Sequence, residues 1–108
     1  FVEGVFNRAV AGNKKNLNPK ATSCKTDITD FKSLERVFEK EKPDYVVHAA
    51  ANIKVRGSVK NPLHDANINI IGGLNVLEAC KKFKVKKIIY LCSGGAVYGD
   101  PKYLPVDE

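Results

Sequence analysis

The sequence predicts an α/β fold built on a parallel, doubly wound sheet, and three observations support this class. Short apolar, β-branched segments alternate with longer segments whose apolar residues recur at helical spacing. Strand–helix–strand alternation is typical of parallel sheets that helices cover. The chain has 108 residues, of which 44% are hydrophobic and 28% charged, so it has the size and balance of one small globular domain.

The first half is expected to contain two short strands and one helix. A possible strand covers residues 2–6, a loop covers residues 8–20 and a weak strand covers residues 21–26. The helix begins after Asp30, a suitable N-cap, and ends at Lys42-Pro43, because proline disfavours helix at the residue before it. Its apolar residues at helical spacing are Phe31, Leu34, Val37 and Phe38.

The second half is expected to contain two strands around a long helix. Residues 45–50 and 88–92 are continuous apolar runs, which predict strands buried on both faces. Between them, Asn61 as N-cap and Pro62 at the first helical position open a helix that extends to about Phe83. Residues 93–95 are expected to form a loop, and residues 99–108 an irregular segment. The stripe expected to be buried on the long helix comprises Leu63, Ala66, Asn67, Ile70, Leu74, Leu77 and Lys81.

Charge and cysteine content narrow the possible functions. The net charge is +6, but the densest run of lysines, residues 81–87, lies where a helix should end, and helix C-termini attract cations. We therefore expect no nucleic-acid partner. The chain has three cysteines, Cys24, Cys80 and Cys92, whereas a disulfide framework requires an even number. We therefore expect buried free thiols and a reducing, cytoplasmic compartment. No apolar run is long enough to span a membrane, and no metal-ligand spacing occurs.

Ligands of parallel sheets bind beyond the carboxyl ends of the strands, so the residues there are candidate site residues. Asp27 could accept a hydrogen bond from a nucleotide or cap a turn. Residues 49–51, all alanine, would admit a ligand close to the backbone or allow tight packing. Asn69 lies near the buried stripe and needs polar partners. Ser93 could bind a substrate oxygen, whereas His48 is expected to be a core histidine.

Taken together, these segments resemble the extended short-chain dehydrogenase/reductases, in particular the NAD-dependent epimerase/dehydratase branch and its UDP-glucose 4-epimerase-like members. The residues that carry the resemblance are 27–30, 43–51, 58–62, 69–77 and 93–100. The resemblance implies a Rossmann-type sheet that is incomplete here, because the G-x-G-x-x-G loop of the first strand does not occur in the chain. The four strands would be the second to the fifth of the order 3-2-1-4-5-6, and would form two pairs without their common neighbour. Residues 1–108 are then a partial NAD(P)-binding domain without a second domain.

The resemblance also implies a role for each candidate residue. Asp27 and Ile28 would hold the adenine of NAD, by side chain and by backbone. Ala49, Ala50 and Ala51 would line the pyrophosphate and the nicotinamide ribose, and Asn69 would brace the cofactor loops. Asn7 and Cys92 complete the cofactor-binding set, although the residue type at position 7 leaves NADP open.

The catalytic residue that the resemblance implies is Ser93, which would assist the tyrosine of a Tyr-x-x-x-Lys pair expected beyond residue 108. This assignment assumes one extra residue in the turn at 94–96, because counting back without it would reach Gly94, which has no side chain to do the task.

The implied function is that of a nucleotide-sugar 4-epimerase with tightly bound NAD, a UDP-sugar substrate and a homodimeric complete form. The 108-residue chain alone is expected to be inactive. A 4,6-dehydratase is an alternative, but it would carry an Asp-Glu pair after the final strand, where this chain has Ser93-Gly94. A non-catalytic dinucleotide-binding regulatory protein is the alternative from another class.

Overall fold

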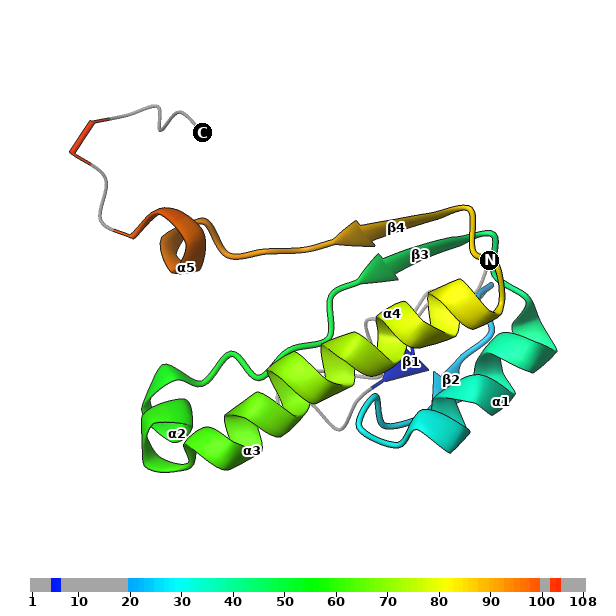
Figure 1. Ribbon diagram of the computed structural model, residues 1–108, viewed down its shortest axis with the longest axis horizontal. Helices are drawn as coiled ribbons and strands as arrows, with labels where there is room; N and C mark the ends of the chain where they lie inside the picture. The colour runs from blue at the N-terminus through cyan, green and yellow to red at the C-terminus, as the bar shows by residue number, and fades with distance from the viewer. Residues whose placement is uncertain (1–4, 7–19, 100–101, 104–108) are drawn as a thin grey trace.

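The computed structural model describes residues 5–6, 20–99 and 102–103, and its strands form two parallel pairs. β1 (Val5–Phe6) pairs with β2 (Cys24–Lys25), and β3 (Tyr45–His48) pairs with β4 (Lys87–Tyr90). Among the described residues no ladder joins the two pairs (Figure 1). This confirms the α/β class, and the pairing is the one expected from the order 3-2-1-4-5 without its first strand. The loop expected at residues 8–20 lies outside the described residues except for Lys20.

The first helix, α1 (Phe31–Glu41), begins and ends where its caps predict. The Asp30 carboxylate accepts a hydrogen bond from the Ser33 N–H at 3.1 Å and so satisfies one backbone donor of the first turn. At the other end Lys42 has a φ of 46°, and its N–H donates to the Phe38 carbonyl at 2.8 Å. Leu34 and Phe38, one helical turn apart, are both buried.

A long helical rod occupies the second half of the chain (Figure 1). It consists of α3 (Pro62–Ala66), the π-helical segment η2 (Asn67–Gly72) and α4 (Gly73–Lys82). Asn61 caps it by accepting from the His64 N–H at 3.2 Å, and Pro62 is its first residue, as predicted. The short helix α2 (Val55–Lys60), which precedes it, was not expected from the sequence.

The buried face of the rod is not the predicted one. Leu63 is 83% exposed and Ile70 59% exposed, and Leu74 and Leu77 are exposed as well. The buried residues are instead Gly72, Gly73, Val76, Ala79 and Cys80. Both stripes have helical spacing, so periodicity alone could not choose between them. Small residues occupy the inner face because they let the rod approach its neighbours closely: a Cβ on Gly72 would lie 2.6 Å from Ile28 Cδ1.

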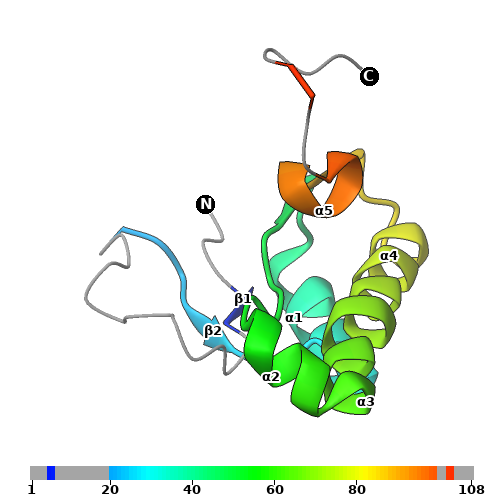
Figure 2. The same cartoon turned by 90° about the vertical axis from the view of Figure 1, so that its left-hand side faces the viewer.

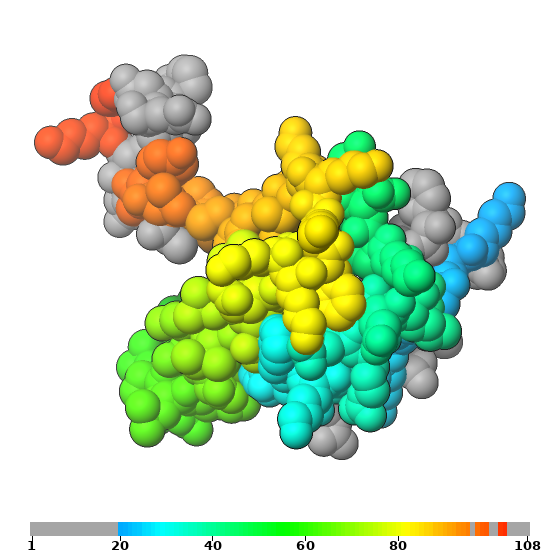
Figure 3. Space-filling model, turned by 45° about the vertical axis from the view of Figure 1, so that its right-hand side comes forward, coloured from blue at the N-terminus to red at the C-terminus, as the bar shows by residue number. Residues whose placement is uncertain are grey.

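The hydrophobic core lies between α1 and α4, which are side by side in two views (Figure 2, Figure 3). The Phe38 and Phe83 rings meet there with centroids 5.8 Å apart. Val46 of β3 and Ile88 of β4 pack against this cluster, so the two helices cover one face of the β3–β4 pair. The buried apolar residues of the cluster are Ile28, Leu34, Phe38, Val76, Ala79 and Cys80.

The prediction that both central strands are buried on both faces is wrong. Tyr45 is 67% exposed and Val47 61% exposed, and Ile89 and Leu91 are exposed as well. Alternate residues of a strand point to opposite faces, and only the face of Val46 and Ile88 is covered by α1 and α4. The apolar run identified the strands correctly, but the described residues provide a covering layer on one side only.

The segment after β4 is also helical rather than a loop. α5 (Gly94–Tyr98) follows Ser93 directly, and it projects away from the body of the molecule (Figure 3). It ends at Gly99, which has a φ of 68°, a conformation that favours glycine. Two adjacent glycines at the start of this segment favoured the loop interpretation.

Candidate functional site

The residues after β3 and β4 lie at one end of the sheet, because these two strands are parallel. The Leu91 N–H donates to the His48 carbonyl at 3.0 Å and extends the pairing by one residue beyond the strands. Past this point Ala49 and Ala51 are exposed and Ala50 is half-buried. Cys92 and Ser93 are exposed on the neighbouring segment. Five of the predicted site residues are therefore brought to the same edge.

The turn after β2 carries the two residues expected to hold an adenine. Asp27 is exposed, and its Oδ1 accepts from the Thr29 N–H at 2.9 Å and from the Thr29 hydroxyl at 2.8 Å. Asp27 therefore organises an Asx-type turn, while its carboxylate faces solvent. Ile28 is 1% exposed and anchors the turn in the core, so the exposed part of this turn that can meet a ligand is Asp27.

Asn75 of α4 connects this turn to the long rod. Its Nδ2 donates to the Ile28 carbonyl at 2.8 Å. The sequence analysis did not single out Asn75, because its place between Gly72 and Val76 becomes informative only once the structure shows which face the rod buries.

A second polar network ties the loop after β3 to the same rod. Asn69 Oδ1 accepts from the Asn52 N–H at 2.7 Å, and Asn69 Nδ2 donates to the Asn52 carbonyl at 3.2 Å. The backbone of Asn52, which directly follows the three alanines, is thus held on both sides. Asn69 lies in η2, and π-helical turns of this kind often occur where a helix presents functional side chains.

Asp65 is the acceptor at the centre of this network. Its Oδ1 receives hydrogen bonds from the Ser58 hydroxyl at 2.5 Å, from Asn52 Nδ2 at 2.9 Å and from Asn69 Nδ2 at 3.1 Å. The hydrogen bond from Ser58, supported by those from Asn52 and Asn69, lowers the pKa of the Asp65 carboxyl. The network joins α2, α3, η2 and the loop after β3 into one unit. Sequence reasoning found Asn69 but missed Asn52, Ser58 and Asp65.

Ser93 precedes α5 in an extended conformation, with φ −82° and ψ 123°. Its hydroxyl makes no capping hydrogen bond to the helix, so the side chain is not engaged in ending or starting α5. Cys92 Sγ lies 3.9 Å from the Ser93 carbonyl. Asn7, the remaining predicted site residue, lies outside the described residues.

One Tyr-x-x-x-Lys spacing does occur in the chain, from Tyr98 to Lys102. The two residues would share a face only if the helix continued through both of them. α5 ends at Tyr98, and the positive φ of Gly99 turns the chain away, so Tyr98 and Lys102 do not lie on one helix face. This spacing is therefore not a tyrosine–lysine pair of the helical kind.

His48 is a core residue, as predicted. It is 5% exposed, and its ring contacts Tyr90 edge to face with centroids 4.9 Å apart. Burial lowers the pKa of the His48 imidazole below its usual value of 6.5, because the charged form loses hydration. His48 therefore has a structural role: it packs against Tyr90 of β4, just before the alanines of the site.

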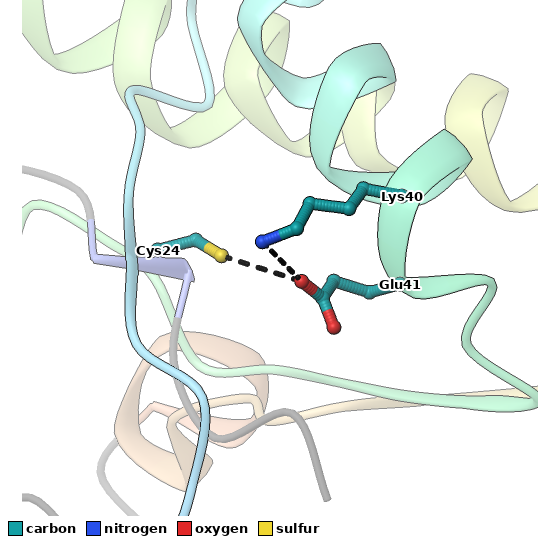
Figure 4. A network of polar contacts seen from close by, with 3 residues as sticks. All are labelled: Cys24, Lys40 and Glu41. Atoms are coloured by element: carbon teal, nitrogen blue, oxygen red, sulfur yellow. Dashed lines mark hydrogen bonds and ion pairs between the residues drawn. The ribbon is translucent and has the colours of Figure 1, made fainter.

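The three cysteines differ in exposure, which corrects the expectation that all are buried. Cys80 is buried, Cys24 is half-buried and Cys92 is exposed. The Cys24 thiol points toward Glu41 Oε1 at 4.0 Å, and Lys40 Nζ lies 3.1 Å from the same oxygen (Figure 4). The hydrogen bond with Glu41 raises the pKa of the exposed Lys40 ammonium. Within the described residues, no three His, Cys, Asp or Glu side chains gather as a metal site would require.

Comparisons with known proteins place these features in a family. The sequence pattern of the NAD dependent epimerase/dehydratase family matches residues 2–108. The UDP-glucose 4-epimerase of Lacticaseibacillus casei is 38% identical over 104 residues, which are 96% of this chain and 31% of that enzyme. In the part of the chain that the structure describes, no helix is both long and apolar enough to cross a lipid bilayer.

Two solved structures resemble the chain closely. The UDP-glucose 4-epimerase of Thermus thermophilus in complex with NAD is 35% identical, with a TM-score of 0.84 over 92% of this chain and 32% of that enzyme. The UDP-glucose 4-epimerase of Thermotoga maritima with UDP-glucose is 40% identical, with the same TM-score over 93% of this chain and 33% of that enzyme. The chain thus spans about a third of the length of the relatives that it matches.

Proposed function

Because the chain belongs to the NAD dependent epimerase/dehydratase family, we propose that it is the cofactor-binding part of a nucleotide-sugar 4-epimerase. The proposed substrate is a UDP-sugar, because both solved structures that the chain resembles are UDP-glucose 4-epimerases and one of them holds UDP-glucose. The observation that carries the proposal is the convergence of Ala49–Ala51 and Cys92–Ser93 at one edge of the β3–β4 pair. The activity belongs to the complete protein, since the chain spans about a third of its relatives.

The residues at this edge, together with the turn after β2, fit a dinucleotide such as NAD. The exposed Asp27 carboxylate is an acceptor for the amino group of adenine, and the small side chains of Ala49–Ala51 leave the backbone open to a phosphate or a ribose. Asn69 holds the following residue, Asn52, in place. When bound, NAD would supply transient oxidation and re-reduction at C4 of the sugar.

Ser93 is the residue that we assign to the sugar. Its exposed hydroxyl is not engaged in capping α5, so it can donate to the C4 oxygen and orient it. We assign the general base, which would accept the proton of the C4 hydroxyl, to a tyrosine outside residues 1–108, because Tyr98 lacks a lysine on the same helix face.

The complete protein is proposed to be a cytoplasmic homodimer. The exposed apolar stripe of the rod supports a protein partner, since monomers seldom expose contiguous apolar surface. The stripe consists of Leu63, Ile70, Leu74 and Leu77.

The complete protein, incubated with UDP-galactose and no added cofactor, tests this proposal. We expect UDP-glucose to accumulate until equilibrium is reached. Chromatography of the nucleotide sugars measures its formation. A 4-keto-6-deoxy product would instead establish a dehydratase. Dinucleotide binding without any turnover would establish a non-catalytic regulatory protein, and either result would overturn the proposed activity.

A further inference from the structure

Asn75 of α4 is hydrogen-bonded to the turn that carries Asp27. Its Nδ2 donates to the Ile28 carbonyl at 2.8 Å, a contact between residues 47 apart in the chain. Gly72, one turn earlier on the rod, has no side chain at the point where Ile28 packs, and a Cβ there would lie 2.6 Å from Ile28 Cδ1. The rod therefore fixes Ile28 both at its side chain and at its carbonyl.

The position of the Asp27 carboxylate follows from two sets of contacts. Within the turn, Thr29 donates twice to Asp27 Oδ1, which fixes the carboxylate relative to its own backbone. Across the fold, Asn75 fixes that backbone relative to the rod. Thr29 alone would leave the turn able to tilt as a unit, so the direction of the carboxylate depends on what holds Ile28, which is its packing against Gly72 and the hydrogen bond from Asn75.

The same rod holds the other loop of the site. Asn69 grips Asn52 after β3, and Asn75 grips Ile28 after β2. The two asparagines are six residues apart, which is about 9 Å along a helix. Because both loops are held by one stiff element, the distance between them is set by that helix rather than by the loops themselves.

We propose that Asn75 is a positioning residue, whose amide fixes the Asp27–Ile28 turn so that the Asp27 carboxylate meets the amino group of a bound adenine. The proposal rests on the function proposed above, because it assumes that Asp27 faces the adenine of a dinucleotide. Asn75 itself touches no ligand, and it acts only through the backbone of Ile28.

Two dinucleotides provide a readout that a purely structural role would not change. NAD carries an amino group on its adenine, whereas its hypoxanthine analogue carries a carbonyl oxygen at the same position, which would face the Asp27 carboxylate unfavourably. The ratio of their dissociation constants, measured by calorimetry on the nucleotide-free complete protein, reports how well that carboxylate is aimed. We expect the wild-type protein to prefer NAD by about tenfold, the scale of one hydrogen bond to a charged group.

Asn75→Asp removes the donor while preserving the size of the side chain, and Asn67→Asp adds the same charge at an exposed position on the same rod. We expect the preference for NAD to fall to less than about threefold in Asn75→Asp, to disappear in Asp27→Asn and to persist in Asn67→Asp. Asn75→Ala, which removes the donor without adding charge, replaces Asn75→Asp if that variant does not fold.

Failure of the proposed function and failure of the role of Asn75 would give different results. A wild-type protein that binds neither dinucleotide would contradict the proposed function itself. A wild-type protein that binds both equally would show that Asp27 does not face the adenine amino group, and would overturn the role of Asn75 with it. If the wild-type protein prefers NAD and Asp27→Asn abolishes the preference, but the Asn75 variants keep it, the role of Asn75 is overturned. Equal weakening of both dinucleotides by the Asn75 variants would also overturn it, because that pattern indicates a structural role only.

Discussion

Asn69 grips the backbone of Asn52 from both sides, accepting from its N–H at 2.7 Å and donating to its carbonyl at 3.2 Å. A side-chain amide that pairs with a peptide unit in this way replaces the hydrogen bonds that a neighbouring strand would otherwise make. The loop after β3 is thereby ordered by a helix, in a position just beyond the three alanines. This pairing is the basis of the first prediction.

Asn69→Ala is expected to loosen the loop at residues 49–52 and to weaken NAD binding by the complete protein about tenfold. The variant loses three hydrogen bonds, two with the backbone of Asn52 and one with Asp65. Each of the two with Asn52 is worth about 0.5–1.5 kcal/mol, and the Asn52 backbone is left without partners from this side chain. Calorimetric titration with NAD measures the effect, with the exposed Asn67→Ala as the matched control. Unchanged NAD affinity in Asn69→Ala would show that the loop does not contact the cofactor.

Ser93→Ala in the complete protein should lower kcat for UDP-sugar epimerisation while leaving NAD affinity nearly unchanged. The expected loss of transition-state stabilisation is about 1.5–3 kcal/mol, because one hydrogen bond to a developing charge is removed. Ser23→Ala, at an exposed position before β2, is the control. Equal kcat values for wild type and Ser93→Ala would mean that another residue of this turn occupies the catalytic position.

The lowered pKa of His48 predicts that the free energy of unfolding decreases toward acidic pH. Its pKa is lowered in the fold, so the unfolded chain binds a proton more readily, and stability is fully present above about pH 6.5. As the pH falls through the unfolded value toward the lower folded value, the contribution is lost at up to about 1.4 kcal/mol per pH unit.

His48→Phe, which keeps a ring against Tyr90 but cannot titrate, should show a shallower decline in the free energy of unfolding between about pH 7 and about pH 5. Urea unfolding of the complete protein and of the variant measures this. Parallel pH profiles for the two proteins would contradict the assignment of His48 as a neutral core residue.

The 108-residue polypeptide studied alone is expected to lack cooperative thermal unfolding or to self-associate, and to show no epimerase turnover. Tyr45, Val47, Ile89 and Leu91 are exposed on one face of the β3–β4 pair, and no ladder joins this pair to β1–β2 among the described residues. Calorimetry with analytical ultracentrifugation tests the first point. A strictly monomeric species with a single sharp transition would refute it.

Features that depend on local chemistry were predictable from the sequence. Asp30 and Asn61-Pro62 mark helix starts because their side chains or ring satisfy the first turn directly, and the structure has both caps. The strands at residues 45–48 and 87–90 were identified from apolar runs, and their parallel pairing followed from the helix between them.

Features that depend on contacts between segments distant in the sequence were not predictable. Leu74 and Val76 are both apolar and both fit a helical stripe, and only the close approach at Gly72 decides which of them faces the core. The network of Asn52, Ser58 and Asp65 joins a loop to two helices, so its members show no spacing in the sequence that would connect them. Asn69 could be found because it lies inside a helix, where a polar residue requires partners.

The fate of a deuterium label at C4 of the sugar tests the proposed epimerase most directly. The complete protein is incubated in ordinary water with UDP-galactose that carries deuterium at C4, and the UDP-glucose formed is analysed by mass spectrometry. Bound NAD would hold this hydrogen out of contact with water between oxidation and re-reduction, so we expect the product to retain the deuterium. Product that has exchanged its label with water, or the absence of any conversion, would contradict the account.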